Sequence, residues 1–158
     1  MVYLLQVYEG KYLSKLFRIL SWVSSLVFFP KQQTKTTSDT IRLGAYVVFS
    51  DTSIIAFSGA HLNIKYDNNL LELDSLAPGW VGPGSLTDSN KTTPLFTYVE
   101  NQGVLDLYAY YLSTADISID SLTHIAEIWF KPKSAGTSVV SYDTSKCCLL
   151  YTSDAADE

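Results

Sequence analysis

Few side chains in this 158-residue sequence have the types and spacing that catalysis requires. Glu72 and Asp74 stand two residues apart, so in a strand both carboxylates would share one face, as a hydrolytic acid pair could. Such pairs are also common on the solvated face of an exposed strand, and we favour that interpretation. His61 and His124 have no neighbouring nucleophile, and we expect both to face water. With no Gly-x-Ser-x-Gly or phosphate-binding glycine loop, the sequence predicts no catalytic residue.

Metal and cofactor sites are predicted to be absent as well. Residues 116–120 place oxygen-bearing side chains at alternate positions, as a calcium loop does, but the sixth position is Ser121 and not glycine. We favour a connecting segment over a calcium site. Cys147 and Cys148 are adjacent and could not form an ordinary disulfide with each other, so we infer neither a disulfide framework nor a cysteine-based metal site.

The elements that would position any site are short strands, beginning with a pair in residues 56–79. Apolar and polar side chains alternate along the first strand of this pair, the rhythm of a strand with one buried and one wet face. The predicted inward set is Ala60, Leu62, Ile64 and Tyr66, and the outward set is His61, Asn63 and Lys65. Residues 67–69 (Asp-Asn-Asn) favour a turn, and a second alternation then runs to Pro78-Gly79.

Further strands are predicted at residues 40–50, 94–100, 104–112, 125–131 and 139–142. Asn101-Gln102-Gly103 indicates a hairpin turn, and Pro132 should mark a strand end or an edge. In the later strands we expect Leu105, Leu107, Ala109, Ala126, Ile128 and Phe130 to point inward. The outward residues are then Asp106, Tyr108, Tyr110, Glu127, Trp129 and Lys131. The sequence therefore predicts an all-β body.

Residues 1–30 are predicted to form a separate unit. Basic residues precede an uncharged run that stops at Pro30, the order of a secretory signal or an uncleaved anchor, and residues 16–29 could tether the chain to a membrane. The alternative is an amphipathic helix docked on the body. Residues 31–39 are polar and are predicted to be a mobile linker.

Two ordered motifs carry a resemblance to a known family. Residues 62–79 read apolar-x-apolar-x-Tyr-Asp-x-x-Leu-Leu-x-Leu-x-Ser-Leu-x-Pro-Gly, and residues 125–137 run from a small and aliphatic alternation into Phe-Lys-Pro-Lys and a glycine-containing turn. Together they resemble the central and late strands of cohesin-type domains of the cellulose-binding and dockerin-binding superfamily. The resemblance implies an antiparallel β-sandwich of jelly-roll type. From the hydrophobic run in residues 1–30 we also expect an N-terminal hydrophobic helix.

The resemblance also implies a site and a partner. In cohesins, the sheet that contains the strands matching residues 56–66 and 104–112 is the one that meets dockerin. The implied partner-binding residues are His61, Asn63, Lys65, Asp106, Tyr108 and Tyr110. The alternative is that these are ordinary surface residues of a sheet, or are covered by the N-terminal segment. Trp129 belongs to the other motif strand and is expected on the opposite sheet.

We expect the cohesin-like body at residues 40–147. Residues 148–158 resemble a translated sequencing adapter and are excluded from it. The family's closing strand would then be missing, which predicts an unpaired sheet edge.

The predicted function is a non-catalytic, extracellular or cell-surface module that binds a dockerin-like protein domain. Two alternatives stay open, a carbohydrate-binding module that recognises a polysaccharide and a structural cell-surface repeat. A hydrolase is the least favoured. The net charge is −5 with no basic stripe, which excludes nucleic acid as a favoured partner because phosphate contacts need clustered basic side chains.

Overall fold

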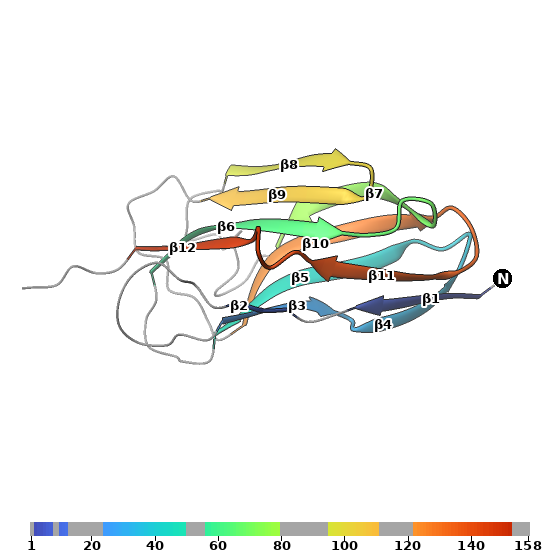
Figure 1. Cartoon of the computed structure of the whole chain (residues 1–158), viewed down its shortest axis with the longest axis horizontal. Helices are drawn as coiled ribbons and strands as arrows, with labels where there is room; N and C mark the ends of the chain where they lie inside the picture. Colours follow the sequence, from blue (N-terminus) through green and yellow to red (C-terminus); the bar gives the residue numbers. More distant parts are fainter. Residues whose placement is uncertain are drawn as a thin grey trace, which may run out of the picture.

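The computed structural model of this chain describes residues 2–7, 10–12, 24–49, 56–79, 95–110 and 122–152. Every regular element in these ranges is a strand, and the strands form two sheets packed face to face (Figure 1). This confirms the predicted all-β sandwich. The candidate calcium segment at residues 116–120 lies outside the described residues.

The larger sheet has seven strands and carries most of the predicted site. Its order is β4 (Gln32–Thr36), β1 (Val2–Val7), β11 (Thr137–Tyr142), β6 (Ala56–Lys65), β9 (Val104–Tyr110) and β8 (Leu95–Asn101). The seventh strand, β12 (Cys148–Thr152), pairs with β6 on the same side as β11 does. All pairs are antiparallel except that of β1 with β11, which is parallel.

The smaller sheet has five strands and is antiparallel throughout. Its order is β2 (Gly10–Tyr12), β3 (Ser24–Phe29), β5 (Ile41–Phe49), β10 (Leu122–Pro132) and β7 (Leu71–Pro78). The pairing of β10 with β7 shifts register between Trp129 and Phe130, and this irregularity brings Leu76 as well as Leu73 against the core. The simple alternation predicted for β7 therefore holds only for its first half.

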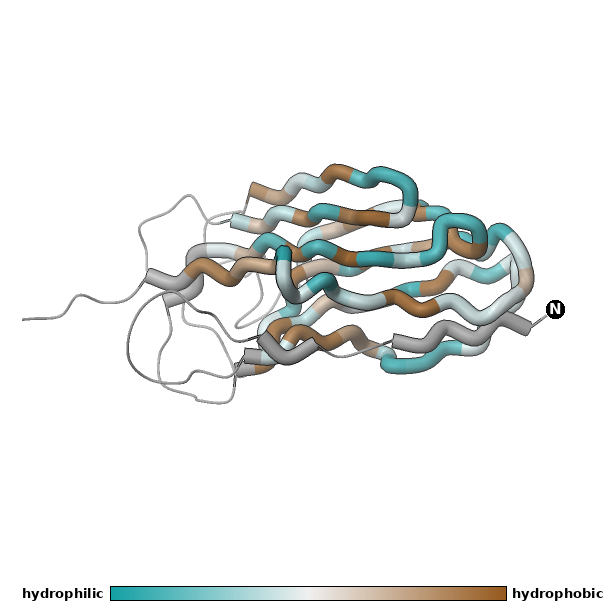
Figure 2. The backbone as a smooth tube through the Cα atoms, in the orientation of Figure 1, coloured by the Kyte–Doolittle hydropathy of each residue, from teal (hydrophilic) through white to brown (hydrophobic). Residues whose placement is uncertain are grey.

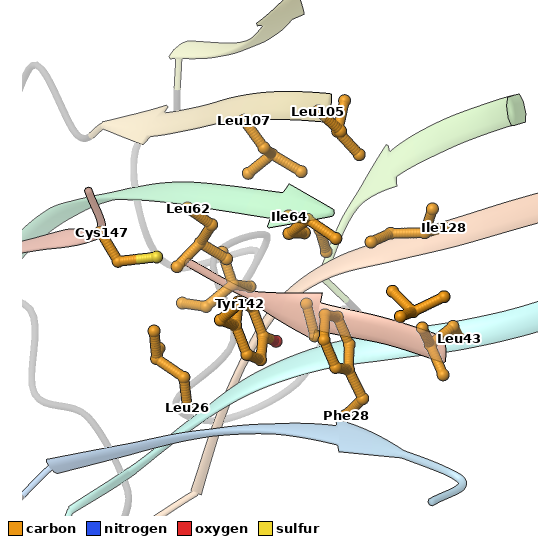
Figure 3. Close-up of a cluster of buried hydrophobic side chains, with 14 of the residues drawn as sticks. Leu26, Phe28, Leu43, Leu62, Ile64, Leu105, Leu107, Ile128, Tyr142 and Cys147 are labelled. Atoms are coloured by element: carbon orange, nitrogen blue, oxygen red, sulfur yellow. The ribbon is translucent and has the colours of Figure 1, made fainter. Parts of the chain in front are cut away.

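The core lies between the sheets, and the side chains that the sequence alternation predicts to point inward fill it. Hydrophobic and hydrophilic positions alternate along the strand backbones, as Figure 2 shows. Fully buried side chains come from both sheets and meet in one cluster (Figure 3). They include the predicted inward residues Ala60, Leu62, Ile64, Leu105, Leu107, Ala109, Ala126, Ile128 and Phe130. Burial of this apolar surface is the main force that holds the two sheets together.

Two predicted turns and one predicted strand end are confirmed. The amide of Leu70 donates to Asp67 O at 3.1 Å, and the amide of Asn69 donates to the Asp67 carboxylate at 2.9 Å. At the β8–β9 hairpin, Gln102 and Gly103 both have positive φ, as a tight two-residue turn between twisted strands requires. β10 ends at Pro132, which cannot donate a ladder hydrogen bond.

The expected N-terminal helix is corrected for the residues that the structure describes. Ser24–Phe29 is a strand, and its Leu26 and Phe28 are buried in the core. The Phe28 ring stacks on Tyr142 at 3.9 Å, and the Tyr142 hydroxyl donates to Val27 O at 3.1 Å. A short apolar run cannot be assigned to helix or buried strand from hydropathy alone, which explains the difference. Residues 13–23 lie outside the described part of the chain.

The expected separation between the N-terminal unit, the linker and the body also differs from the structure. Residues 32–36, predicted as part of a linker, form β4 and pair with β1. Because β3 belongs to the core, residues 24–29 are not free to serve as part of a tether. Among the described residues, no helix is long and apolar enough to cross a membrane.

The adapter-like residues were expected to lie outside the body, but part of them is paired in the larger sheet. Residues 148–152, which we excluded as adapter-like, form β12 and pair with β6 from Cys148–His61 to Thr152–Ala56. Leu149 of this strand is buried in the core cluster. Burial alternates over residues 147–150, as in a strand with one face against the core.

Candidate functional site

The pairing of β6 with β9 brings the predicted partner-binding residues together. Their register places His61 opposite Tyr108 and Asn63 opposite Asp106, with Tyr110 one row further along, opposite Gly59. Because alternate residues of a strand point to opposite faces, burial of Leu62 and Leu107 directs the predicted set to the outer face. We call this surface, centred on His61, Asp106, Tyr108 and Tyr110, the outer face of β6–β9.

The polar centre of this surface is a three-residue hydrogen-bond network. Asn63 Nδ2 donates to Asp106 Oδ1 at 2.7 Å, and His61 Nε2 lies 2.9 Å from the same oxygen. Burial by itself would raise the pKa of Asp106, but the hydrogen bonds from Asn63 and His61 outweigh it, and the pKa lies below its ordinary value. The carboxylate is therefore ionised and held in one orientation at neutral pH.

Aromatic rings stand next to this network. The His61 ring stacks on Tyr108 with centroids 4.4 Å apart and planes 3° apart. Tyr108 and Tyr110 lie 6.2 Å apart with their planes tilted by 36°. Burial raises the pKa of Tyr110, so its hydroxyl stays protonated and can donate a hydrogen bond. The surface thus offers amphipathic rings, which protein interfaces use often.

Asn63 and Lys65, predicted as partner-binding residues, instead contact the connection between β11 and β12. Asn63 is only 1% exposed, because the segment between β11 and β12 covers it. The Asp143 amide donates to Asn63 O at 2.9 Å, and Cys147 Sγ lies 3.3 Å from the Asn63 amide nitrogen. Lys65 forms an ion pair with Asp143 at 2.7 Å. Both residues therefore fix the β11–β12 connection against β6, and neither is a free contact group.

The Lys65–Asp143 pair has a clear electrostatic signature. The hydrogen bond from Lys65, assisted by one from Ser145, lowers the pKa of Asp143 to about 2. The Asp143 carboxylate is thus charged at any physiological pH. Its pairing anchors one border of the outer face of β6–β9.

Three exposed apolar residues extend this surface, and the sequence analysis missed them. Leu95 of β8 lies opposite Tyr110, Val99 of β8 lies opposite Asp106, and Leu150 of β12 lies opposite Gly59. All three are exposed. The alternation of β8 could have revealed Leu95 and Val99, but Leu150 was set aside with the adapter-like residues. The resulting apolar row runs from Leu150 across Tyr110 to Leu95.

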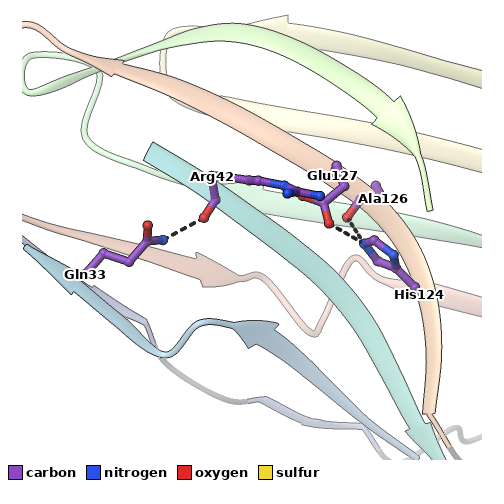
Figure 4. Close-up of polar contacts among 5 residues, drawn as sticks. All are labelled: Gln33, Arg42, His124, Ala126 and Glu127. Carbon is purple, nitrogen blue, oxygen red and sulfur yellow. Dashed lines mark hydrogen bonds and ion pairs between the residues drawn. The ribbon is translucent and has the colours of Figure 1, made fainter. Parts of the chain in front are cut away.

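The opposite outer face, on the five-stranded sheet, holds a network in which Arg42 and His124 both contact Glu127 (Figure 4). Arg42 Nε donates to Glu127 Oε2 at 2.7 Å, and His124 Nε2 lies 3.1 Å from Glu127 Oε1. Arg42 also lies over the Trp129 ring, and His124 stacks on Tyr46. Gln33 donates from its side chain to Arg42 O at 2.7 Å, which ties β4 to this sheet.

His124 and Glu127 were predicted on the surface, and both are buried. Burial lowers the pKa of His124, despite the opposing effect of the Glu127 charge, so this imidazole is neutral near pH 7. The register shift between His124 and Ala126 changes which face of the sheet the residues on either side of it point to. The sequence pattern did not show this shift. These residues stabilise the β5–β10 pair.

Catalytic or metal-binding geometry is not found in the described ranges. Asp74 pairs with Lys131, and both it and Glu72 are exposed, as expected for a solvated strand face. No group of three His, Cys, Asp or Glu side chains that could hold a metal ion is present there. A cleft of about 440 Å³ beside Tyr66 contains Glu100, whose carboxylate accepts a hydrogen bond from the Tyr66 hydroxyl at 2.8 Å.

The family model described as "Cohesin domain" matches residues 45–154. Among curated protein sequences, none matches the chain.

Solved structures give a consistent picture of the fold. The second type II cohesin module of the adaptor ScaA scaffoldin of Acetivibrio cellulolyticus superposes with a TM-score of 0.59 and 17% identity, covering 84% of this chain and 80% of that one. The third cohesin of ScaC, in complex with the ScaB dockerin from the same organism, gives 0.54 and 16%, covering 73% and 78%. The sixth cohesin of scaffoldin B, in complex with a dockerin, gives 0.52 and 20%, covering 70% and 75%.

Proposed function

Because the chain belongs to the cohesin domain family, we propose that it is a non-catalytic module that binds a dockerin-type protein domain. The family is one of binding modules, and two of the similar solved structures are cohesins in complex with dockerins.

The proposed binding surface is the outer face of β6–β9 with its extension onto β8 and β12. The observation that carries this assignment is the combination of a pre-organised Asp106 carboxylate with exposed or half-exposed apolar groups around it. The carboxylate and the His61 ring provide orientation through hydrogen bonds. Tyr108 and Tyr110 provide buried area, and aromatic residues of this kind often dominate binding energy.

The outer face of β6–β9 suits a protein partner better than a sugar chain. A flat polysaccharide platform would need the exposed rings to be coplanar and in a row. The planes of Tyr108 and Tyr110 are tilted by 36°, and Tyr108 is already stacked on His61. The apolar row of Leu150, Tyr110 and Leu95 would instead contact an apolar protein surface.

We also propose an extracellular or cell-surface location, since two of the similar solved structures are modules of scaffoldins. Residues 24–29 belong to the core strand β3, so export or attachment would have to rely on other parts of the protein.

The experiment is a binding assay with immobilised dockerin domains of type I and type II as probes. Biolayer interferometry would compare the unmodified chain with Tyr110→Ala and Tyr108→Ala. Phe29→Ala is the matched control, because Phe29 is an aromatic residue, 66% exposed, on the other sheet. We expect the unmodified chain to bind dockerin. Tyr110→Ala should weaken the affinity at least tenfold, or about 1.4 kcal/mol in binding free energy, and Phe29→Ala should leave the affinity unchanged. Equal losses in the two variants, or no binding to any dockerin, would count against the proposal.

A further inference from the structure

β8 is an edge strand of the seven-stranded sheet. It pairs with β9 along its whole length, from Leu95–Tyr110 to Asn101–Val104, and no other described strand pairs with its second edge. In Figure 1 it forms the upper border of the sheet. An edge of this kind presents a row of backbone donors and acceptors that can accept another strand.

The exposed apolar side chains of the described residues are concentrated on this strand. Leu95 is 49% exposed, Tyr98 46% and Val99 62%, and they make up half of the large exposed hydrophobic residues in the part of the chain that the structure describes. Sheet edges in natural proteins are usually protected by lysine, proline or a β-bulge. The β8 sequence LFTYVEN contains no lysine or proline, and its register with β9 is continuous.

The sequence of β8 is also complementary to itself. In an antiparallel pair centred on Thr97, Leu95 of one copy lies opposite Val99 of the other, and Phe96 lies opposite Tyr98. Both pairs are apolar, and cross-strand pairs of aromatic and aliphatic side chains stabilise a sheet. A register centred on Tyr98 would instead place Phe96 opposite the charged Glu100.

From these observations we propose that β8 pairs with β8 of a second copy of this chain, in the register centred on Thr97. The only charged residue of the strand, Glu100, falls outside the paired apolar residues. Its carboxylate already accepts hydrogen bonds from the Tyr66 hydroxyl and the Gly103 amide. Like charges therefore do not meet at the centre of the pair.

The pairing makes a closed dimer. The two-fold axis passes between the two Thr97 residues, perpendicular to the sheet. Each copy uses the free edge of its β8, so no further copy can add there. Two seven-stranded sheets join into one, and the outer faces of β6–β9 in both copies face the same side. The dimer would therefore present two binding surfaces on the same side of the joined sheet.

The first test measures mass against protein concentration by sedimentation velocity and light scattering on the full chain. We expect a transition from the 17.6 kDa monomer to twice that mass as the concentration rises. Val99→Lys places a charge within the proposed β8–β8 pair, so this variant should remain a monomer at every concentration. Val139→Lys is the control, because Val139 is exposed on β11 of the same sheet, away from the edge, and it should dimerise normally.

The second test fixes the register with cysteine cross-links in a Cys148→Ser background, which removes the exposed native thiol. Thr97→Cys places two thiols directly opposite each other, at a Cα separation of about 5 Å that a disulfide can span. Val99→Cys places the two thiols four residues apart along the strands, about 13 Å, which is too far for a disulfide to span. Mild oxidation should link the first variant as a dimer and leave the second unlinked.

The proposal is overturned if the unmodified chain remains a monomer at every concentration. It is also overturned if the dimer persists in Val99→Lys, if larger open polymers form, or if Val99→Cys cross-links in place of Thr97→Cys. Circular dichroism and a melting curve for each variant confirm that the chain is folded before its mass is interpreted.

Discussion

The ring of Tyr110 lies directly over Gly59, its cross-strand neighbour. A Cβ atom at residue 59 would stand 2.3 Å from Tyr110 Cδ1 and 2.7 Å from Ala109 O. No side chain fits in that space without moving the ring or the backbone of β9. The glycine therefore sets the position of Tyr110, the aromatic residue at the centre of the apolar row on the outer face of β6–β9.

The first prediction concerns Gly59→Ala. Overpacking at this contact should destabilise the fold by about 1–3 kcal/mol and displace the Tyr110 ring. Urea unfolding measures the change in the free energy of unfolding. Gly136→Ala is the matched control, since the nearest atoms to a Cβ there belong to the end of the Leu70 side chain, at 3.0 Å or more. A smaller loss for Gly59→Ala than for Gly136→Ala would contradict this account.

The second prediction concerns Asp106→Asn. The neutral side chain cannot accept both hydrogen bonds as a carboxylate does. The free energy of unfolding of the variant should therefore be lower by about 1 kcal/mol at pH 7. Because the pKa of Asp106 is depressed in the folded state, its stabilising effect is present above about pH 4 and is lost as the pH falls through the folded pKa. Melting curves from pH 7 to pH 3 should show the two proteins converging at low pH. A difference that grows on acidification would refute the assignment.

The third prediction concerns Lys65→Met. Removing the ammonium group should raise the pKa of Asp143 from about 2 toward its ordinary value, though not fully, because the hydrogen bond from Ser145 remains. Carboxyl resonances in an NMR titration would report this change. Asp39 is an internal control, since Thr36 and not Lys65 lowers its pKa. An unchanged Asp143 titration would show that the pair does not form in solution.

The fourth prediction tests whether β3 belongs to the sandwich. Phe28→Leu removes the ring stacked on Tyr142 and should cost about 1–2 kcal/mol in the free energy of unfolding. Phe29→Leu, at the exposed neighbouring position, should cost less than about 0.5 kcal/mol. If residues 1–30 were a separate unit, neither change would alter the unfolding of the body.

The body of the fold could be predicted from the sequence because its strands alternate cleanly. Leu62, Leu107 and Ile128 read inward from period-2 alternation alone, and the structure buries each of them. The turn at Asp67 and the hairpin at Gly103 have residue types that their backbone conformations require.

Other features depended on pairing partners that no local pattern reveals. Residues 24–29 are uniformly apolar or small, and their assignment to a strand depends on β5 beside them and on Tyr142 opposite. The burial of His124 and Glu127 depends on a register irregularity in β10 and on Arg42 from β5.

The grouping of four candidate residues on one outer face was predicted from the sequence. His61, Asp106, Tyr108 and Tyr110 share one face because two strands separated by nearly 40 residues pair in one register. The sequence could not show that Asn63 is covered, because the covering residues lie 80 or more positions later.

The most direct test of the central proposal is an NMR map of amide shifts on adding a saturating dockerin domain. We predict that the perturbed residues form one patch on the outer face of β6–β9, including His61, Tyr108 and Tyr110, and that β5 and β10 residues such as Arg42 and Trp129 stay unchanged. A perturbed patch on the five-stranded sheet, with the outer face of β6–β9 unaffected, would contradict the account.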